Sequence, residues 1–257
     1  MDCRIGLLMA TWFPISYLAA IYTFDWHGQD RNSERSIRRR SVGVAVICAC
    51  NLLLTRLWLG SWRSIGLARL GLQESAASLL LTIVLFAGPL VQEIVTGDFA
   101  AYLTKSFWRH HLRDLITLRN WFISPISEEL LFRGCGVAVL SDCLSDKSLL
   151  AVSPLFFSLA HLHHMRELRR NGHSWTQACA ISCFQAVYTY IFGVYASYLF
   201  LQTRVVLAPM VAHCFCNFMG FPPVAELMRL PMGSRFPVAA AYILGLAAWT
   251  HFLPILF

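Results

Sequence analysis

Long apolar runs separated by short polar loops are the main feature of this sequence. Eight of these runs have the character of transmembrane helices, and they cover about residues 4–24, 41–59, 76–96, 121–144, 148–162, 175–201, 205–221 and 236–257. No internal repeat or low-complexity segment interrupts them. The pattern predicts an all-α fold: a polytopic membrane helical bundle with about eight transmembrane helices, forming one transmembrane domain over residues 1–257.

Two regions of the pattern need a separate interpretation. The first apolar run, from Ile5 to Thr23, contains no clear small-residue cleavage site and is interpreted as a spanning helix instead of a removable signal. Between residues 98 and 120, aromatic and aliphatic residues alternate with basic ones. This mixture predicts a basic amphipathic helix at the membrane surface, with an ordinary solvated loop as the alternative.

Composition supports the membrane class. Of the 257 residues, 57% are hydrophobic and 14% are charged, whereas soluble domains carry about 25% charged residues. The net charge of +7 could indicate nucleic-acid binding, but the basic residues lie in short loops between apolar runs. We therefore expect the lipid bilayer as a partner and no nucleic acid.

The basic residues also predict an orientation. If the N-terminus lies outside the cytosol, the cytosolic loops hold fourteen of them: Arg31, Arg35, Arg38, Arg39, Arg40, Lys105, Arg109, Arg113, Arg119, Arg166, Arg169, Arg170, Arg229 and Arg235. The other side holds five: Arg4, Arg63, Arg69, Lys147 and Arg204. Cytosolic loops carry an excess of Lys and Arg, so this arrangement is favoured over its inverse.

The nine cysteines do not suggest a disulfide framework. Eight of them lie in or beside apolar helices: Cys48, Cys50, Cys135, Cys143, Cys179, Cys183, Cys214 and Cys216. We interpret them as small buried hydrophobes. Cys214 and Cys216 could suggest a thiol protease, but the spacing places no basic partner beside them.

Three charged residues interrupt the fourth apolar run. One charged residue at the bilayer centre costs about 2.5–3.5 kcal/mol on the lowest scales, so Glu128, Glu129 and Arg133 predict a functional site that faces the protein interior. Glu129 and Arg133 are four residues apart and can pair on one helix face. Glu128 is rotated by about 100° from Glu129 and has no cation at i+3 or i+4, so it is left free for chemistry. The alternative is a buried ion-pair cluster that only holds helices together.

Two further polar pairs interrupt apolar helices. Phe157 and His161 end the fifth run, and His213 and Asn217 lie in the second half of the seventh. Members of each pair are four residues apart and share a helix face. In the favoured orientation Glu128 lies about 10 Å deep, and the other polar side chains fall in the same cytosolic half of the bilayer. A lone membrane histidine usually has a packing role, but this agreement in depth indicates one site.

These residue types suit a hydrolase without a covalent nucleophile. A carboxylate and an imidazole that share one water form a general base, with Glu128 as proton acceptor. His213 and Asn217 are suitable donors for an oxyanion hole. A zinc site made by Glu128, His161 and His213 is the alternative, although the chain has no His-Glu-x-x-His motif. Because Asn217 is a poor zinc ligand and a good neutral donor, we expect no metal and no other cofactor.

The chain resembles the CaaX protease and bacteriocin-immunity family, and within it the type II CaaX prenyl endopeptidases. The resemblance covers about residues 121–220, which we take as the catalytic core. It is carried by three motifs in order: Glu128-Glu129-x-x-x-Arg133, Phe157-x-x-x-His161 and His213-x-x-x-Asn217. It implies an eight-helix protein of the endoplasmic-reticulum membrane that removes the last three residues of a prenylated Cys-a-a-X tail.

The resemblance also implies a role for each motif residue. Glu128 and His161 would activate water, and His213 and Asn217 would stabilise the oxyanion. Glu129, Arg133 and Phe157 would shape the site. The implied partners are farnesylated or geranylgeranylated CaaX proteins, such as small GTPases, which meet the active site on the cytosolic side of the membrane.

Two non-protease interpretations remain. A membrane scaffold or immunity-type protein would use the polar cluster for assembly alone. A proton-coupled transporter would need acidic residues along a path through the membrane, and Glu93 is the only further acidic residue expected inside a span.

Overall fold

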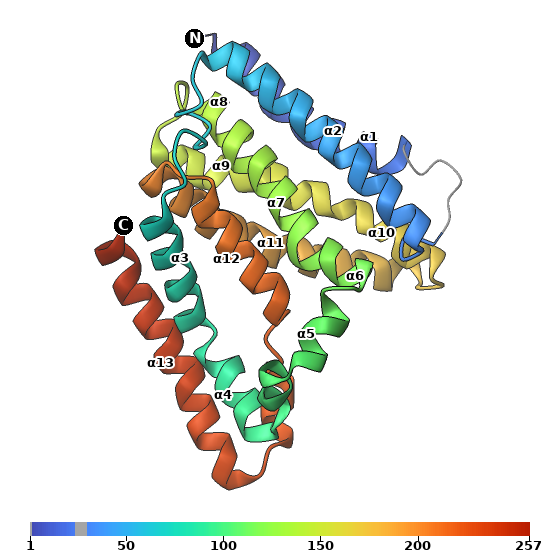
Figure 1. Cartoon of the computed structure of the whole chain (residues 1–257), viewed down its shortest axis with the longest axis vertical. Helices are drawn as coiled ribbons and strands as arrows, with labels where there is room; N and C mark the ends of the chain where they lie inside the picture. The colour runs from blue at the N-terminus through green and yellow to red at the C-terminus, as the bar shows by residue number, and fades with distance from the viewer. Residues whose placement is uncertain (1, 24–29) are drawn as a thin grey trace.

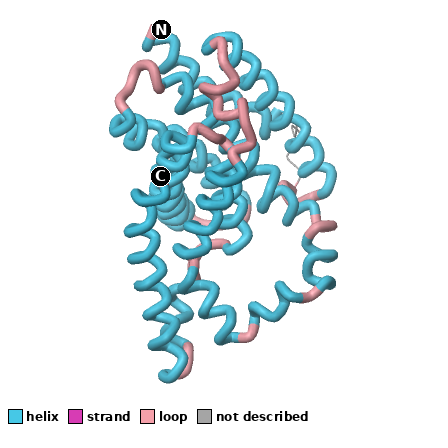
Figure 2. Tube along the Cα trace, turned by 60° about the vertical axis from the view of Figure 1, so that its left-hand side comes forward, coloured by secondary structure: helices cyan, strands magenta, loops and turns pink. Residues whose placement is uncertain are grey.

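The computed structural model describes residues 2–23 and 30–257, and over these residues the chain forms helices, turns and loops without a strand (Figures 1 and 2). The predicted all-α fold is confirmed. The expected end of the first helix, at Phe24, lies outside the described residues.

Four helices of the described chain are long and apolar enough to cross a bilayer, and a bent pair makes a fifth candidate. The four are α1 (Cys3–Thr23), α2 (Glu34–Leu59), α11 (Trp175–Thr203) and α13 (Met232–Leu256). The molecule is therefore a multi-pass membrane protein. Helices form at all eight expected places, but two of the helices that carry polar motifs are short. Helices α9 (Asp146–Ala160) and α12 (Leu207–Met219) are about 22 and 20 Å long, against a hydrocarbon core of about 30 Å.

The bent pair corrects the expectation of one straight helix over residues 76–96. Helix α3 (Leu72–Leu85) and helix α4 (Ala87–Thr96) meet at an angle of 59°. Gly88 and Pro89 follow the break, and a proline ring clashes with the carbonyl four residues earlier, here that of Leu85. Helix α13 packs along both members of the pair (Figure 1).

The helix that carries the two glutamates is continuous from Leu115 to Leu140 but is not a regular α-helix. It consists of α6 (Leu115–Leu118), the π-helical η2 (Arg119–Ile123), α7 (Ser124–Glu129), the π-helical η3 (Leu130–Val137) and α8 (Ala138–Leu140). Pro125 lacks the N–H that would bond to Trp121, and the widened turn of η2 lies at that place. The expected helix over 121–144 thus starts earlier and ends four residues sooner.

The segment before this helix is neither one amphipathic helix nor an open loop. It is divided into η1 (Asp98–Leu103), α5 (Lys105–His111) and α6. The Thr104 side chain accepts a hydrogen bond from the backbone N–H of Phe107, and the Asp114 side chain accepts from those of Ile116 and Thr117. Each cap starts a new helix and so interrupts the periodicity that the sequence suggested.

The remaining polar motifs lie on helices that pack around α7. Helix α9 runs into η4 (His161–His163) and α10 (His164–Arg170), and α11 packs along α9. Gly193 of α11 allows close contact between α11 and α9, because a Cβ atom there would lie 2.8 Å from Cβ of Pro154. Helix α12 packs against both α7 and α3, and η5 (Val224–Arg229) leads from it to α13.

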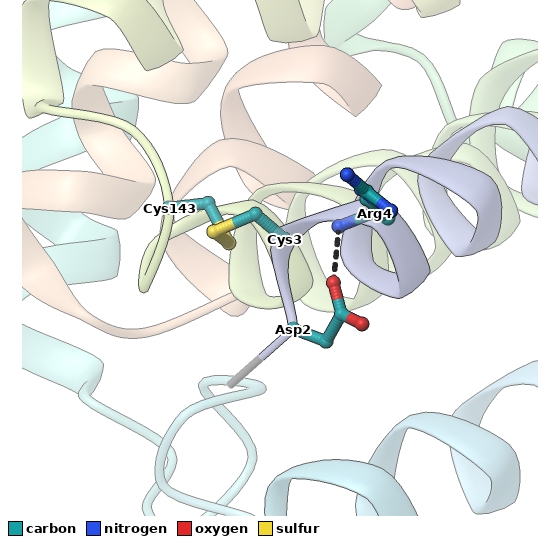
Figure 3. The surroundings of a disulfide bond; sticks show 4 residues. All are labelled: Asp2, Cys3, Arg4 and Cys143. Atoms are coloured by element: carbon teal, nitrogen blue, oxygen red, sulfur yellow. Dashed lines mark hydrogen bonds between the residues drawn. A yellow bond between two sulfur atoms is a disulfide. The ribbon is translucent and has the colours of Figure 1, made fainter.

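A disulfide joins Cys3 to Cys143, and the interpretation of Cys143 as a buried hydrophobe was wrong (Figure 3). The two residues are 140 positions apart, and they meet because α1 packs along α8. Gly6 permits this packing, since a Cβ atom there would lie 2.9 Å from the carbonyl oxygen of Val139.

The free cysteines follow the prediction only in part. Cys48 and Cys135 are buried, and Cys214 and Cys216 are half-buried. Cys50, Cys179 and Cys183 are exposed on α2 and α11, where apolar side chains face outward, as expected for a surface that lipid covers.

Candidate active site

The centre of the candidate site is the buried carboxylate of Glu129, which has no exposed surface. Its Oε1 accepts a hydrogen bond from Nη1 of Arg133 at 2.9 Å, as the spacing of four residues predicted. The same oxygen accepts a second hydrogen bond, at 2.7 Å, from Nδ1 of His213 on α12. The first donor lies on the helix of Glu129 itself and the second lies on α12, so Glu129 links the two helices. The buried charges of Glu129 and Arg133 compensate each other.

Arg133 is held from three sides. Besides its bond to Glu129, its Nη2 donates to the carbonyl oxygen of Gly193 on α11 at 3.2 Å. Its guanidinium carbon lies 4.5 Å from the ring centre of Phe157 on α9. A planar cation between a carboxylate, a carbonyl and an aromatic face has a fixed position. The ring of Phe157 also contacts the rings of His161 and His213, with centroid distances of 4.6 and 6.0 Å.

Glu128 is separate from this ion pair, as the helix geometry predicted. Its Oε2 lies 3.8 Å from Nε2 of His213, which is too long for a direct hydrogen bond. The gap is typical of two groups that are bridged by a third atom. Because Nδ1 of His213 donates to Glu129, Nε2 is the ring nitrogen that faces Glu128.

His161 is oriented by the end of its own helix. Its Nδ1 lies 2.8 Å from the carbonyl oxygen of Phe157. A carbonyl oxygen only accepts, so Nδ1 carries the proton and Nε2 of the neutral ring has a free lone pair. This tautomer leaves Nε2 able to accept a proton.

Asn217 lies at the end of α12, where its side chain is exposed to the cavity. Its Nδ2 donates to the backbone carbonyl oxygen of Asn120 at 2.8 Å. One amide hydrogen and the side-chain oxygen of Asn217 remain available for another partner. Unlike the other motif residues, Asn217 therefore lies beside η2 and away from the Glu129 ion pair.

Four of the polar motif residues line one cavity of about 1430 Å³. Glu128, His161, His213 and Asn217 each contribute to its wall. One part of the wall, between α11 and α13, is apolar and includes Ile191, Phe192, Ile243, Leu246 and Leu253. Another part carries basic side chains from the start of α2, from η2 and from α10. The cavity can thus take a molecule that has both a long apolar part and a polar part.

Comparison with known proteins decides the family. A family model described as type II CAAX prenyl endopeptidase Rce1-like matches residues 111–219, which include every motif residue. CAAX prenyl protease 2 of Homo sapiens is 33% identical over 262 residues, covering 95% of this chain and 78% of the relative. The chain belongs to the CAAX prenyl protease 2 family.

Further relatives agree with this assignment. CAAX prenyl protease 2 of Caenorhabditis elegans is 28% identical over 96% of this chain and 95% of its own length. The probable CAAX prenyl protease 2 of Schizosaccharomyces pombe is 31% identical over 84% of this chain and 80% of its own length. No solved structure matches the chain. As a member of the family, the protein is a protease, a CaaX prenyl endopeptidase.

The structure adds site residues to this family member that sequence reasoning missed. The ring of Phe192 lies 4.5 Å from that of His213, and its place inside a continuous apolar run gave no signal. The hydroxyl groups of Tyr17 and Ser127 lie 3.0 Å apart at the cavity wall. Ser127 precedes the two glutamates and could have been suspected, but Tyr17 lies on α1 and only the fold brings it there.

The histidines and carboxylates of the site do not group as metal ligands do. In residues 2–23 and 30–257, no three His, Cys, Asp or Glu side chains are arranged so that they could hold one ion. The set Glu128, His161 and His213 would need its side chains to converge, whereas His213 is directed by Glu129 and contacts Glu128 only at 3.8 Å.

Proposed function

We propose that this protein removes the C-terminal aaX tripeptide from prenylated CaaX proteins with a water molecule that Glu128 and His161 activate. The observation that carries the proposal is the Glu128 carboxylate at the cavity wall, for which the described structure gives no direct hydrogen bond, beside a Glu129 that Arg133 and His213 already engage. Glu128 would accept the proton of the water as it attacks the carbonyl carbon of the prenylated cysteine. Nε2 of His161 is the second acceptor available to that water.

His213 and Asn217 would stabilise the oxyanion that forms in this step. Because Nδ1 of His213 donates to Glu129, its Nε2 has a hydrogen to offer only when the ring is doubly protonated. The carboxylates of Glu128 and Glu129 lie on either side of this ring. The free amide hydrogen of Asn217 would be the second donor.

The cavity suits the two parts of such a substrate. The apolar wall between α11 and α13 would contact the farnesyl or geranylgeranyl chain, and the peptide would lie along the polar wall toward Glu128. Small GTPases with prenylated tails are the expected partners. Residues 1–257 would act as one transmembrane domain, with the catalytic core at about 121–220.

The location that we propose is the endoplasmic-reticulum membrane, with the site open to the cytosol. The excess of arginines in the loops near the cavity supports this orientation. The disulfide supports it independently, because Cys3 begins α1 and Tyr22, at the other end of that helix about 30 Å away, lines the cavity. A disulfide persists on the oxidising side of that membrane, so this pairing favours a cavity that opens on the reducing side.

The decisive experiment measures cleavage of a farnesylated CaaX peptide by the purified protein in vesicles. Glu128→Gln keeps the shape of the side chain but removes the base, so we expect the loss of essentially all turnover with an unchanged unfolding temperature. Glu93→Gln makes the same change on α4, away from the cavity, and should keep activity. Wild-type turnover in Glu128→Gln would exclude the mechanism.

A zinc-dependent mechanism is the alternative, and it would require Glu128, His161 and His213 to converge on one ion. We expect the active enzyme to contain no stoichiometric zinc and to survive prolonged chelation. The reason is that Asn217 is a poor ligand for a zinc ion but a good hydrogen-bond donor to an oxyanion. One zinc ion per active chain, with activity lost on removal and regained on its return, would establish the metalloprotease mechanism instead.

A further inference from the structure

A ring of arginines surrounds the polar part of the cavity, and the proposed mechanism gives it no role. Among the described residues that line the cavity, five are arginines: Arg31, Arg40, Arg119, Arg166 and Arg170. Asp30, Glu128 and Glu167 are the acidic ones, and Glu167 is engaged by Arg31 at 2.7 Å. This part of the wall therefore carries an excess of positive charge that suits an anion.

Arg119 is the member of this ring that three hydrogen bonds hold in place. Its Nη1 donates to the backbone carbonyl oxygen of Arg31, its Nη2 to Oδ1 of Asn32 and its Nε to Oδ1 of Asn120. These acceptors are neutral oxygens, and they fix the guanidinium without neutralising it. Burial first, and then the charges of Arg31 and Arg40, lower the pKa of Arg119 to about 10. An anion at this place would relieve that repulsion.

The distance from Arg119 to the reactive groups matches the length of the tail that the enzyme removes. Arg119 and Glu128 lie on one continuous helix, nine residues apart, which corresponds to a rise of about 13 Å along the helix axis. An extended tripeptide spans about 10 Å from the bond that is cut to its terminal carboxylate. The two lengths therefore agree to within about 3 Å.

The structure also couples Arg119 to the site. Asn120 is the next residue in the chain. Its backbone carbonyl oxygen accepts a hydrogen bond from Nδ2 of Asn217 at 2.8 Å. Any shift of the start of this helix would therefore move Asn217, and the two ends of a bound tripeptide would be held by connected residues.

We propose that Arg119 binds the C-terminal carboxylate of the X residue and so fixes how many residues lie beyond the cut. This inference rests on the proposed function and adds a subsite to it. We take the bound anion to be part of the substrate and not a lipid headgroup, because Arg119 lines the same cavity as Glu128 and lies on the same helix.

The test compares two farnesylated CaaX peptides that differ only in the last group, a free carboxylate or a carboxamide. In vesicles of neutral lipid, the wild type should cleave the acid with a kcat/KM at least about tenfold above that of the amide, since a charge-assisted hydrogen bond is lost. Arg119→Gln should lower kcat/KM for the acid to about the value for the amide and leave the amide almost unchanged. Arg113→Gln, an exposed arginine of the same segment outside the cavity, should keep the wild-type preference.

The outcomes separate this inference from the function on which it rests. Equal cleavage of both peptides by the wild type overturns the subsite while the protease function stands, and this measurement needs no variant. An acid preference that persists in Arg119→Gln also overturns it. An effect of Arg119→Gln that follows the anionic lipid content of the vesicles, and not the peptide terminus, would assign Arg119 to the membrane surface. Failure of the wild type to cleave either peptide would overturn the proposed function and this subsite together.

Discussion

At the scale of single residues, the position of His213 depends on Glu129. One carboxylate oxygen receives both Arg133 and His213, while its second oxygen is buried without a hydrogen-bond partner within the described structure. When a buried carboxylate loses either of two such donors, the free energy of unfolding falls, because part of its charge is left uncompensated. The ion pair thus has a positioning role: it directs the imidazole of His213 toward Glu128.

The first prediction concerns Arg133. Arg133→Ala removes the cation from Glu129 and the donor from the carbonyl of Gly193, so we expect the free energy of unfolding to fall by about 3–5 kcal/mol. Activity should fall as well, because His213 loses its fixed partner. Adding Glu129→Gln removes the unpaired charge and should recover part of the stability. Thermal unfolding of the purified variants measures this, with Arg113→Ala as the exposed control; unfolding of Arg133→Ala at the wild-type temperature would disprove the role of the pair.

A second prediction concerns Asn217. Asn217→Ala removes one proposed oxyanion donor, and such a loss typically lowers kcat by about 10²–10³. It also breaks the bond to Asn120, which should cost about 1 kcal/mol of stability. Steady-state kinetics with a prenylated peptide separates the two effects. A change in KM alone would show that Asn217 binds the substrate without acting on the transition state.

Which residue contacts were predictable follows from their separation in the chain. The Glu129–Arg133 pair is local, and helix geometry alone places the two side chains on one face. The Glu129–His213 bond joins residues 84 positions apart. It depends on how α7 and α12 are rotated against each other, which no local spacing determines. The same holds for Tyr17 and Phe192.

At the scale of elements, the site is built on irregular helices. The apolar runs predicted where helices form, but not the 59° bend before α4 or the two π-helical turns beside Pro125 and after Glu129. A period of 3.6 residues is too coarse to reveal one widened turn, and π-helical turns are frequent at functional sites. Here they lie on both sides of the glutamate pair and so change which way its side chains point.

A third prediction tests the packing of α11 on α9. Gly193→Ala places a Cβ atom 2.8 Å from Cβ of Pro154 and 3.3 Å from Nη2 of Arg133, so the two helices must separate. We expect a loss of about 1–3 kcal/mol in stability together with reduced activity. Gly233→Ala on α13 is the matched control, since no atom lies within 4 Å of its new Cβ, and it should be neutral or slightly stabilising. Equal unfolding temperatures for the two variants would contradict the close packing.

At the scale of the whole molecule, long membrane helices pack against shorter ones that carry motif residues. Helices α9 and α12 are too short to cross a bilayer alone, and they are placed by contacts with α11, α7 and α3. Counting apolar runs therefore predicted where helices form, but not how the short helices are held in place. The disulfide was missed for a similar reason, because the approach of α1 to α8 depends on the assembled bundle.

The fourth prediction concerns orientation. A glycosylation acceptor loop inserted within residues 141–145, beside the disulfide, should be modified in endoplasmic-reticulum membranes, because we place that side in the lumen. The same loop inserted within residues 171–173, between α10 and α11, should stay unmodified. A gel shift before and after glycan removal reports both. The opposite pattern would place the cavity in the lumen and contradict the proposed access of cytosolic substrates.

The Cys3–Cys143 disulfide also constrains the order in which the molecule is assembled during synthesis. The ribosome makes Cys3 140 residues before its partner, so α1 and α2 enter the membrane while the thiol of Cys3 is still free. The bond can close only once the helix of Glu128 and Glu129 has been made and, in the proposed orientation, once the turn after α8 has reached the oxidising compartment. Nascent chains arrested before and after Cys143 should accordingly differ in the reactivity of Cys3 toward a maleimide, and the oxidation enzymes of that compartment would take part in building a catalytic site on the opposite side of the membrane.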